Sequence, residues 1–596
     1  MGDSTGGRCE QNRKNPIEIK MGHRGKSQDE SKEAATNSVP SSPSAAASPY
    51  WGKSTQTSTK PEGFSPLVGF CFTINYILGT GFLTIPWAFT QGGLVLSTIM
   101  IIMVGVFSDM TKNFLLETMA RAEAMLDNQM HWIKRNPGDE EKQRLIYSPV
   151  IIKGETSDLL QSAAMSYDYG ISSMPASANN SSHGVGRGSS SCELSALSLP
   201  AGTSGGHTPT NQGRHLVQRA KQKYLVKHRK FEINSLCRVF LGKIGLRIYT
   251  GFICIYVYCL LWAYTSVFAS SMARAAPLFA DGDTDTNYLI FAIVFAAMVV
   301  PMSCMEMDEQ VVVQVAMTGA RFLMLGLMLG TSSLCAQDIA REESFVEAPM
   351  FQFSGLSKMA PVMVFAHVFH HSIPGLAHPV ADKKELSGMF RSTTVFSTIA
   401  YALIGLILGS NFGGNIEQSS NLNWKNFSGG TAVYNDDGQI ISIAWWAKAI
   451  SLYVLCFPAL DVISAFPLNA ITLGNNMMGS FYGKRIHEVE QDRRIRTQFR
   501  LLASIPPIIF GILERQLGTI TEYAGTTGFV IGFSFPALLY LRSRALAERK
   551  HFSISTFYTG YSSSNPAGWF LFSFGLAMAM YVVFFLIRGE DSDDES

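Results

Sequence analysis

Two long apolar segments of this chain carry helix-breaking residues near their centres. The first, residues 75–89 (NYILGTGFLTIPWAF), contains Gly79, Gly81 and Pro86, and the second, residues 364–379 (VFAHVFHHSIPGLAHP), lies about halfway along the chain. In a lipid bilayer every backbone N–H and C=O needs a hydrogen-bond partner, and an unpaired group costs several kcal/mol. Broken spans at corresponding places in the two halves of a chain therefore predict a solute site between them.

The composition places these segments in a membrane protein. Of the 596 residues, 47% are hydrophobic and only 16% are charged, whereas soluble domains carry about 25% charged residues. A membrane-spanning helix needs about 20 apolar residues to cross about 30 Å of hydrocarbon. We therefore expect an all-α integral membrane protein with eleven transmembrane helices. The expected spans are residues 66–89, 94–115, 248–269, 288–305, 311–334, 359–377, 395–410, 443–473, 499–513, 520–541 and 569–587.

The polar parts of the chain divide it into tails, a membrane domain and one long insertion. Residues 1–63 and the middle of residues 121–236 are polar and rich in Ser and Gly, and they lack the apolar content of a packed core. We expect residues 1–63 to be a disordered tail and residues 64–588 to be the transmembrane domain. A largely disordered loop would interrupt that domain at 121–236, and residues 589–596 would form an acidic tail.

Lysine and arginine in the short loops predict the side of the membrane on which each loop lies, because cytoplasmic loops are enriched in these residues. They are concentrated in the loops that follow the expected sixth, eighth and tenth spans. If there are eleven crossings, these three loops lie on the same side of the membrane. These loops, the N-terminus and the loop at 121–236 are therefore expected in the cytoplasm, and residues 589–596 outside it. The sequon that begins at Asn426 falls in an outward loop, where glycosylation is physically possible.

A short sorting pattern leaves the choice of membrane open. Glu155, Leu159 and Leu160 fit the acidic dileucine pattern that adaptor proteins bind in endosomal and lysosomal sorting, although so short a pattern also arises by chance. The plasma membrane and an endolysosomal or vacuolar membrane both remain open. The formal net charge of +2 indicates no bulk electrostatic partner such as nucleic acid, and membrane lipids are the expected surroundings.

The first broken span predicts an anion site. Gly79 and Gly81 flank Thr80 and remove the side chains that would block access to the backbone. Exposed N–H groups and the positive end of the second half-helix suit a carboxylate, such as that of an amino acid. The alternative is a surface of small residues for close helix packing, but Pro86 downstream and Asn75 one turn earlier favour unwinding.

The second broken span places histidines in an apolar run. His370 and His371 are followed by Ser372 and Pro374, and His367 lies one turn earlier. Ionisable groups inside a membrane mark functional sites by default, and histidine titrates between about pH 5 and 8. We therefore place His370, His371 and Ser372 at the solute site. The alternative is neutral histidines bonded to backbone freed by Pro374; a zinc site is weakly supported, since no cysteine or carboxylate with ligand spacing accompanies them.

Two further spans supply candidate residues. A lone carboxylate at the depth of Asp461 must be protonated, paired or bound to a cation. Asp461 and Ser464, together with Asn75, are therefore candidates for coupling to H⁺ or Na⁺, and a merely structural polar contact is the alternative. In the third span Tyr258 lies among other aromatic residues and is a candidate wall of the substrate site, with a packing face as the equal alternative.

Four stretches in order along the chain resemble the amino acid/auxin permease family of transmembrane amino acid transporters, part of the amino acid-polyamine-organocation superfamily. The resemblance covers most of residues 64–588 and points to an orphan branch. The stretches are residues 75–89 (NYILGTGFLTIPWAF), 370–376 (HHSIPGL), 457–476 (FPALDVISAFPLNAITLGNN) and 535–544 (FPALLYLRSR).

The resemblance implies eleven spans in a five-plus-five inverted repeat, with broken first and sixth helices that line an amino acid site. It also implies that Asn75 corresponds to an asparagine of the sodium site in sodium-coupled members. Their eighth-span threonine has no clear match in this chain, where the region reads Pro458-Ala-Leu-Asp461. That departure favours proton coupling over sodium coupling.

We therefore expect a secondary active transporter of small neutral amino acids that works by alternating access and couples to a cation, with the proton favoured. The alternative class is an amino acid sensor that binds its ligand in the same pocket and signals through the tail and the loop at 121–236. No metal or other cofactor besides the coupling ion is expected. No pair of a nucleophile and a base stands out in the sequence, so we do not expect an enzyme.

Overall fold

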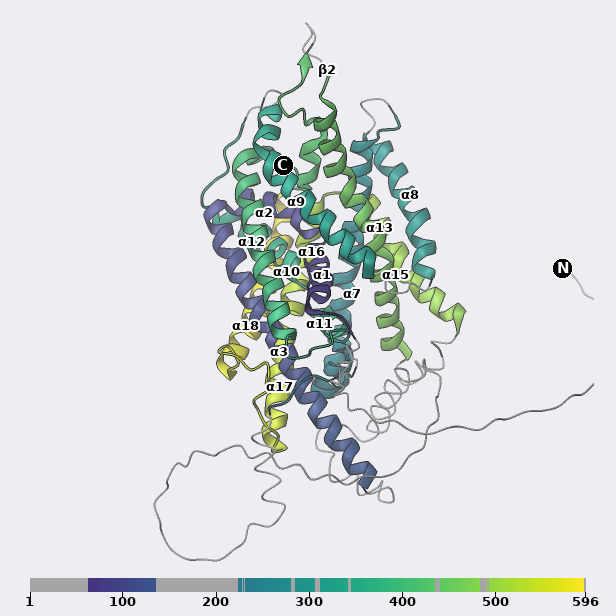
Figure 1. Cartoon of the computed structure of the whole chain (residues 1–596), viewed down its shortest axis with the longest axis vertical. Helices are drawn as coiled ribbons and strands as arrows, with labels where there is room; N and C mark the ends of the chain where they lie inside the picture. The colour runs from purple at the N-terminus through teal and green to yellow at the C-terminus, as the bar shows by residue number, and fades with distance from the viewer. Residues whose placement is uncertain are drawn as a thin grey trace, which may run out of the picture. The chain divides into compact units, whose positions relative to one another are not determined.

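The structure is a computed structural model that describes ten ranges of the chain (Figure 1). These ranges are residues 63–135, 223–227, 229, 231–279, 284–305, 311–340, 345–434, 440–482, 489 and 492–593. Predictions for residues 1–62, for the sorting pattern at Glu155, Leu159 and Leu160, for most of the loop at 121–236 and for residues 594–596 lie outside the described residues.

Eight helices in the described ranges are long and apolar enough to span a membrane. They are α3 (Leu94–Arg135), α7 (Ile233–Ala275), α8 (Thr284–Cys304), α9 (Val311–Ile339), α12 (Leu386–Phe412), α13 (Trp445–Tyr482), the continuous run of α16 (Leu517–Phe529), the π-helical turn η6 (Val530–Ser534) and α17 (Phe535–Arg549), and α18 (Asn565–Asp593). The helices α1 (Pro66–Ile77) and α2 (Gly81–Gly92) form a further candidate span that is bent by 52°. The chain is therefore a helical, multi-pass membrane protein.

The two remaining expected spans are helical but do not meet the same test of length and hydropathy. The helices α10 (Leu356–His367) and α11 (Ile373–Ala377), separated by the 3₁₀ turn η2 (His370–Ser372), occupy the expected sixth span. The helix α15 (Arg493–Leu513) occupies the ninth. The count of eleven crossings and the inverted repeat therefore remain predictions.

The solvent exposure of apolar side chains distinguishes the outer helices from the buried helices at the centre. Large apolar side chains on α8, α9 and α18 are more than half exposed, among them Ile293, Leu323 and Phe584. Every residue of α10 from Met359 to His367, in contrast, is buried. Figure 1 shows α10, α1 and α16 in the middle of the bundle, with α8 and α18 on opposite sides. Exposed apolar faces on the outer helices fit a lipid environment.

The first expected break is present between α1 and α2. The N–H of Leu78 donates to the carbonyl of Ile74 at 2.8 Å and ends α1, and Gly79 and Thr80 connect it to α2. A glycine is required at position 81, because a Cβ there would lie 2.8 Å from the Cα of Ala366 on α10. The glycine thus lets the start of α2 approach α10 closely.

The second expected break follows His367 at the end of α10. Val368 is extended, with φ −80° and ψ 102°, and the chain resumes in η2 and then α11. Pro374 lies in the first turn of α11, where its missing N–H costs no helical hydrogen bond. The hydroxyl of Tyr401 on α12 connects the two breaks, since it lies 2.7 Å from the carbonyl of Ile77 and 2.9 Å from that of Ala366.

A lysine stabilises the far end of α11. The Lys383 ammonium donates to the carbonyls of Ala377 and His378 at 2.8 and 2.6 Å. Burial lowers the pKa of Lys383 to about 8. These carbonyls lie at the end of α11, where no later N–H of the helix can donate to them. The lysine ammonium supplies the missing hydrogen-bond donors.

The loop between α12 and α13 holds short elements and the predicted glycosylation site. It contains the 3₁₀ turns η3 (Gly413–Asn415) and η4 (Ser420–Asn426) and the antiparallel strands β1 (Val433–Tyr434) and β2 (Ile440–Ser442). A further 3₁₀ turn, η1 (Phe353–Gly355), lies outside this loop and precedes α10. Asn426 is exposed, and Ser428 of the same sequon is buried and donates to Asp338 through its N–H and hydroxyl at 2.8 and 2.7 Å. Glycosylation at Asn426 stays a prediction.

Candidate functional site

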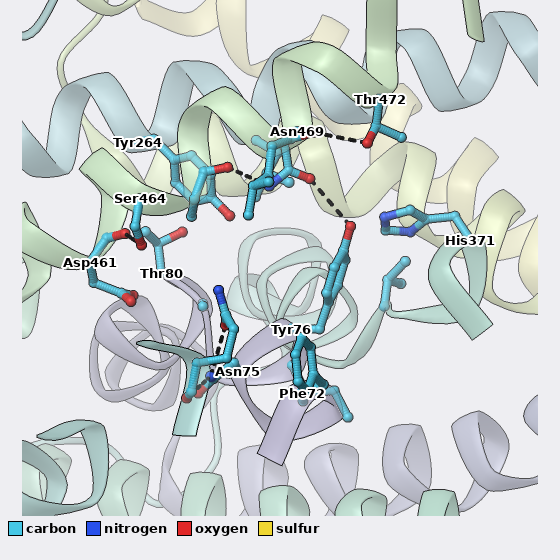
Figure 2. A pocket seen from close by; sticks show the side chains of 18 of the residues that line it. Phe72, Asn75, Tyr76, Thr80, Tyr264, His371, Asp461, Ser464, Asn469 and Thr472 are labelled. Carbon is cyan, nitrogen blue, oxygen red and sulfur yellow. Dashed lines mark hydrogen bonds between the residues drawn. The ribbon is translucent and has the colours of Figure 1, made fainter. Parts of the chain in front are cut away.

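A cavity of about 420 Å³ lies where the two broken spans meet α7, α9 and α13. Most of the residues chosen from the sequence line it, and Figure 2 shows several of them around one pocket. Those that line it are Asn75, Gly79, Thr80, Gly81, His371, Asp461 and Ser464. The two breaks therefore border the same cavity.

Three of the residues chosen from the sequence lie elsewhere. The imidazole of His370 faces α3, where its Nε2 lies 2.8 Å from the hydroxyl of Thr111. Ser372 lines a second cavity of about 480 Å³. Tyr258 lines neither of these two cavities, and its hydroxyl donates to the carbonyl of Leu502 on α15 at 2.7 Å.

Helical geometry explains why Tyr258 does not line the cavity although two other tyrosines of α7 do. Tyr256 and Tyr264 line the first cavity and are eight residues apart, which is a net rotation of about 80°, so both fit on one broad face of α7. Tyr258 follows Tyr256 by two residues, which puts it about 200° around the helix. The aromatic wall expected in the third span therefore exists, but other tyrosines of that span form it.

Backbone N–H groups at the first break have no acceptor within the described ranges. This holds for Gly79, Thr80 and Gly81, which precede or begin α2. The hydroxyl of Thr80 is likewise buried without a partner among the described residues. Because the amino end of a helix carries a partial positive charge and open donors, this part of the cavity fits an anionic group such as a carboxylate.

Carbonyl groups at the second break, in contrast, accept hydrogen bonds from hydroxyls of neighbouring helices. Ser108 donates to the carbonyl of His367 at 3.3 Å, Tyr256 donates to that of Val368 at 3.3 Å, and Tyr401 reaches that of Ala366. The sequence alone does not predict these donors, because they come from helices that are distant in sequence. They explain how the break is tolerated in a membrane.

Arg321 on α9 is the functional-site residue that sequence reasoning missed. Its Nη2 lies 2.5 Å from both carboxylate oxygens of Asp461, and its Nη1 donates to the carbonyl and the Oδ1 of Asn75 at 3.0 and 2.8 Å. Both partners of the ion pair are buried, with side chains 5% and 9% exposed. Asp461 is therefore paired, which is one of the three states expected for it, and it is not a lone carboxylate.

A polar stripe on α9 was the available signal for this arginine. Gln314, Thr318 and Arg321 recur at the spacing of one helix face within an otherwise apolar segment. All three contact Asn75: its amide donates to the Gln314 carbonyl at 2.7 Å, and Thr318 donates to its Oδ1 at 2.9 Å. Ser464, on the same helix as Asp461, donates to the carbonyl of Asp461 at 2.8 Å.

His371 lines both cavities and packs against aromatic side chains. Its ring packs edge-on against Tyr76 and Tyr256, with ring centroids 5.7 and 5.4 Å apart. Tyr76, His371 and Asn469 line both cavities, and the Tyr76 hydroxyl donates to the Oδ1 of Asn469 at 3.4 Å (Figure 2). These three side chains therefore lie where the two cavities adjoin.

The described residues bring together no set of three or more histidine, cysteine, aspartate or glutamate side chains with the geometry of a metal site. The three histidines near the second break point to different surroundings. His367 bonds to the carbonyl of Met363 and the hydroxyl of Thr398, while His370 faces α3 and His371 faces the cavity.

These features define an integral membrane protein of several helices with a central cavity at two broken spans. The chain belongs to a family described as transmembrane amino acid transporter protein, whose model matches residues 62–129 and 213–587. The unmatched stretch between these two ranges falls inside the loop predicted at 121–236.

Relatives from several organisms resemble most of the chain. A Dictyostelium discoideum protein named transmembrane protein 104 homolog is 23% identical over 82% of this chain and 91% of its own length. The Drosophila melanogaster transmembrane protein 104 homolog is 24% identical over 81% and 90%, and the human transmembrane protein 104 is 22% identical over 81% and 88%. Their names state a membrane location and no substrate.

Proposed function

We propose that this chain is a secondary active transporter of small neutral amino acids that works by alternating access. The first break supports the proposal most directly, since the N–H groups of residues 79–81 and the hydroxyl of Thr80 border a cavity and have no acceptor within the described ranges. A substrate carboxylate would accept from them at the positive end of α2. The family to which the chain belongs is one of amino acid transporters.

The ammonium group of the substrate would lie near Val368, which lines the cavity at the second break. The carbonyl of Val368 accepts from the hydroxyl of Tyr256, but a carbonyl oxygen has two lone pairs and can accept a second hydrogen bond. A cavity of about 420 Å³ is near the small end of the usual range for ligand pockets, which starts at about 300 Å³. Its size therefore favours a small solute.

The coupling ion we propose is the proton. The oxygens that a sodium ion would use, from Asn75 and Asp461, already accept from the guanidinium of Arg321. A fixed cation at that position leaves no reason for a sodium ion to bind there, since two cations would repel each other. Asp461 and Asn75 would then act in the transport cycle through their contacts with Arg321.

The second cavity offers a route for release. It lies beside α1, α11 and the ends of α7 and α13, and it shares Tyr76, His371 and Asn469 with the first cavity. Under the predicted orientation, with the loop before α7 in the cytoplasm, it would lead to the cytoplasmic side. Breaking the hydrogen bond between Tyr76 and Asn469 would open the passage between the cavities.

The proposal is tested by flux of radiolabelled amino acids into proteoliposomes that contain the purified chain. A pH gradient and a sodium gradient are imposed separately. We expect saturable uptake of at least one small neutral amino acid, stimulated by the pH gradient and unaffected by sodium. Absence of saturable uptake for any amino acid under either gradient would overturn the proposal.

An amino acid sensor is the second candidate, because one observation connects the cavity to the cytoplasmic loop. Arg229, near the end of that loop, forms ion pairs with Glu123 and Asp127 of α3 at 3.7 and 3.3 Å. A few residues on, Asn234 lines the second cavity and donates to Asn476 at 3.0 Å. A rearrangement of that cavity would therefore be transmitted to the loop.

Deletion of the tail and of residues 136–222 distinguishes the two candidates. If the chain is a transporter, the deletion variant keeps its uptake rate when that rate is normalised to the amount of protein in the membrane. A sensor keeps its ligand binding, yet cells that express the deletion lose the downstream response to amino acids.

A further inference from the structure

His371 carries two buried ring nitrogens without a hydrogen-bond partner among the described residues. It lines the cavity at the breaks, and its ring is held edge-on between Tyr76 and Tyr256. Figure 2 shows the ring directed toward the pocket, on the opposite side from Thr80. The cavity thus has an unsatisfied polar group at each end.

A buried imidazole in this position needs hydrogen-bond partners for its two ring nitrogens. A neutral imidazole carries one donor and one acceptor nitrogen, and a buried polar group left unpaired lowers stability. The neighbouring hydroxyls of Tyr76 and Thr472 donate their hydrogens to Asn469 and to Leu468, so neither is left to donate to the acceptor nitrogen of the imidazole. A molecule inside the cavity can supply that donor.

The adjacent histidine differs, because only its Nδ1 lacks a hydrogen-bond partner among the described residues. The Nε2 of His370 lies 2.8 Å from the hydroxyl of Thr111 and 3.3 Å from the carbonyl of Ser108, and the ring does not border the cavity. Of the two neighbouring histidines, His371 alone lines the cavity, so it is the one able to contact a solute there.

Charge limits which side chain the solute can carry. Among the described residues that line the cavity, Asp461 is the acidic one, and it is paired with Arg321. A cationic side chain would therefore lack a counter-charge in the membrane interior, where unpaired charge is costly. A polar but uncharged side chain needs only a hydrogen-bond partner, and His371 offers both a donor and an acceptor.

We propose that His371 makes the site selective for amino acids whose side chains carry a hydroxyl or a carboxamide. This inference rests on the proposed function, because it assumes that an amino acid occupies the cavity. The carboxylate lies at the first break near Thr80, and the side chain extends to His371 between the tyrosine rings. An aliphatic side chain of equal size leaves His371 unpaired and binds less well.

Two nearly isosteric pairs test the selectivity: threonine against valine, and asparagine against leucine. Uptake of each radiolabelled amino acid into proteoliposomes gives kcat/KM. For the unaltered chain we expect each polar member to exceed its apolar partner by about tenfold or more. His371→Leu lowers both ratios to about one, whereas His371→Gln, which keeps a donor and an acceptor, retains the preference.

His367→Leu is the matched control, because it removes an imidazole near the same break that does not line the cavity. We expect it to leave both ratios as they are, whatever its effect on the amount of protein. Equal uptake of the two members in the unaltered chain, or an unchanged preference in His371→Leu, overturns this inference while transport itself stands. Absence of saturable uptake of any amino acid overturns the proposed function, and the selectivity with it.

Discussion

The two broken helices differ in how their backbone groups are satisfied. At the break between α1 and α2, the N–H groups of residues 79–81 border the cavity without an acceptor among the described residues. At the break after α10, hydroxyls of Ser108, Tyr256 and Tyr401 donate to the carbonyls of residues 366–368. One break is therefore open to a solute, and the other is supported by the protein.

This difference separates two roles that look alike in the sequence. A break whose groups the protein satisfies can stay rigid without a ligand. A break with open donors gains from a bound anion, so its stability depends on occupancy. Changes at the supported break should lower the stability of the fold, and changes at the open break should lower transport.

The largest effect is expected from Arg321→Met. The change leaves the carboxylate of Asp461 buried without its cation and removes the donor to the carbonyl of Asn75, next to the first break. Loss of one partner of a buried ion pair costs about 3–5 kcal/mol. The free energy of unfolding of the detergent-solubilised protein measures the effect. The double variant Arg321→Met/Asp461→Leu is expected to recover much of the loss, and equal stability of single and double variants would argue against the pair.

Gly81→Val comes next. The added Cβ would lie 2.8 Å from the Cα of Ala366, so α2 must move away from α10. Such overpacking costs about 1–3 kcal/mol and distorts the open N–H groups, so uptake is expected to disappear while protein still reaches the membrane. At Gly79 an added Cβ meets its nearest atom only at 3.8 Å, and Gly79→Ala should cause a much smaller loss. Undiminished uptake by Gly81→Val would remove the binding role of this break.

Tyr401→Phe examines the supported break. It removes the hydroxyl shared by the carbonyls of Ile77 and Ala366, and both contacts are buried in the protein. We expect a loss of about 1–3 kcal/mol in the free energy of unfolding. An unchanged stability would show that neither carbonyl depends on the Tyr401 hydroxyl.

Thr80→Val gives the smallest change in stability and examines the open break. The Thr80 hydroxyl has no partner among the described residues, so its removal should alter the free energy of unfolding by no more than about 0.5 kcal/mol. A bound carboxylate would lose one hydrogen bond, and kcat/KM for uptake should fall by about tenfold. A destabilised variant with normal uptake would reverse the roles assigned to the two breaks.

The sequence predicts the breaks well because their causes are local. Glycines around Thr80 and a proline after Ser372 act through the backbone itself, and the structure has both interruptions at those places. The choice between His370 and His371 could not be made from the sequence, because the turn η2 is not a regular helix and the facing helices decide the surroundings of each ring.

Tertiary contacts explain what the sequence analysis missed. Asp461 looks isolated in its own span, and its partner Arg321 lies 140 residues away on α9. A count of charges along the chain does not show such a pair; only the polar stripe that includes Thr318 hints at it. The aromatic cluster of the third span predicts a wall of the cavity but does not show which side chains face it; Tyr256 and Tyr264 line the cavity, and Tyr258 does not.

Competition between a radiolabelled amino acid and its analogue without the carboxylate tests most directly whether the first break binds a carboxylate. In proteoliposomes that contain the purified chain, an excess of the unlabelled amino acid should block uptake, and the corresponding amine should not compete. Equal competition by the amine would mean that the open N–H groups of residues 79–81 do not hold a carboxylate, and it would contradict the role that we give to this break.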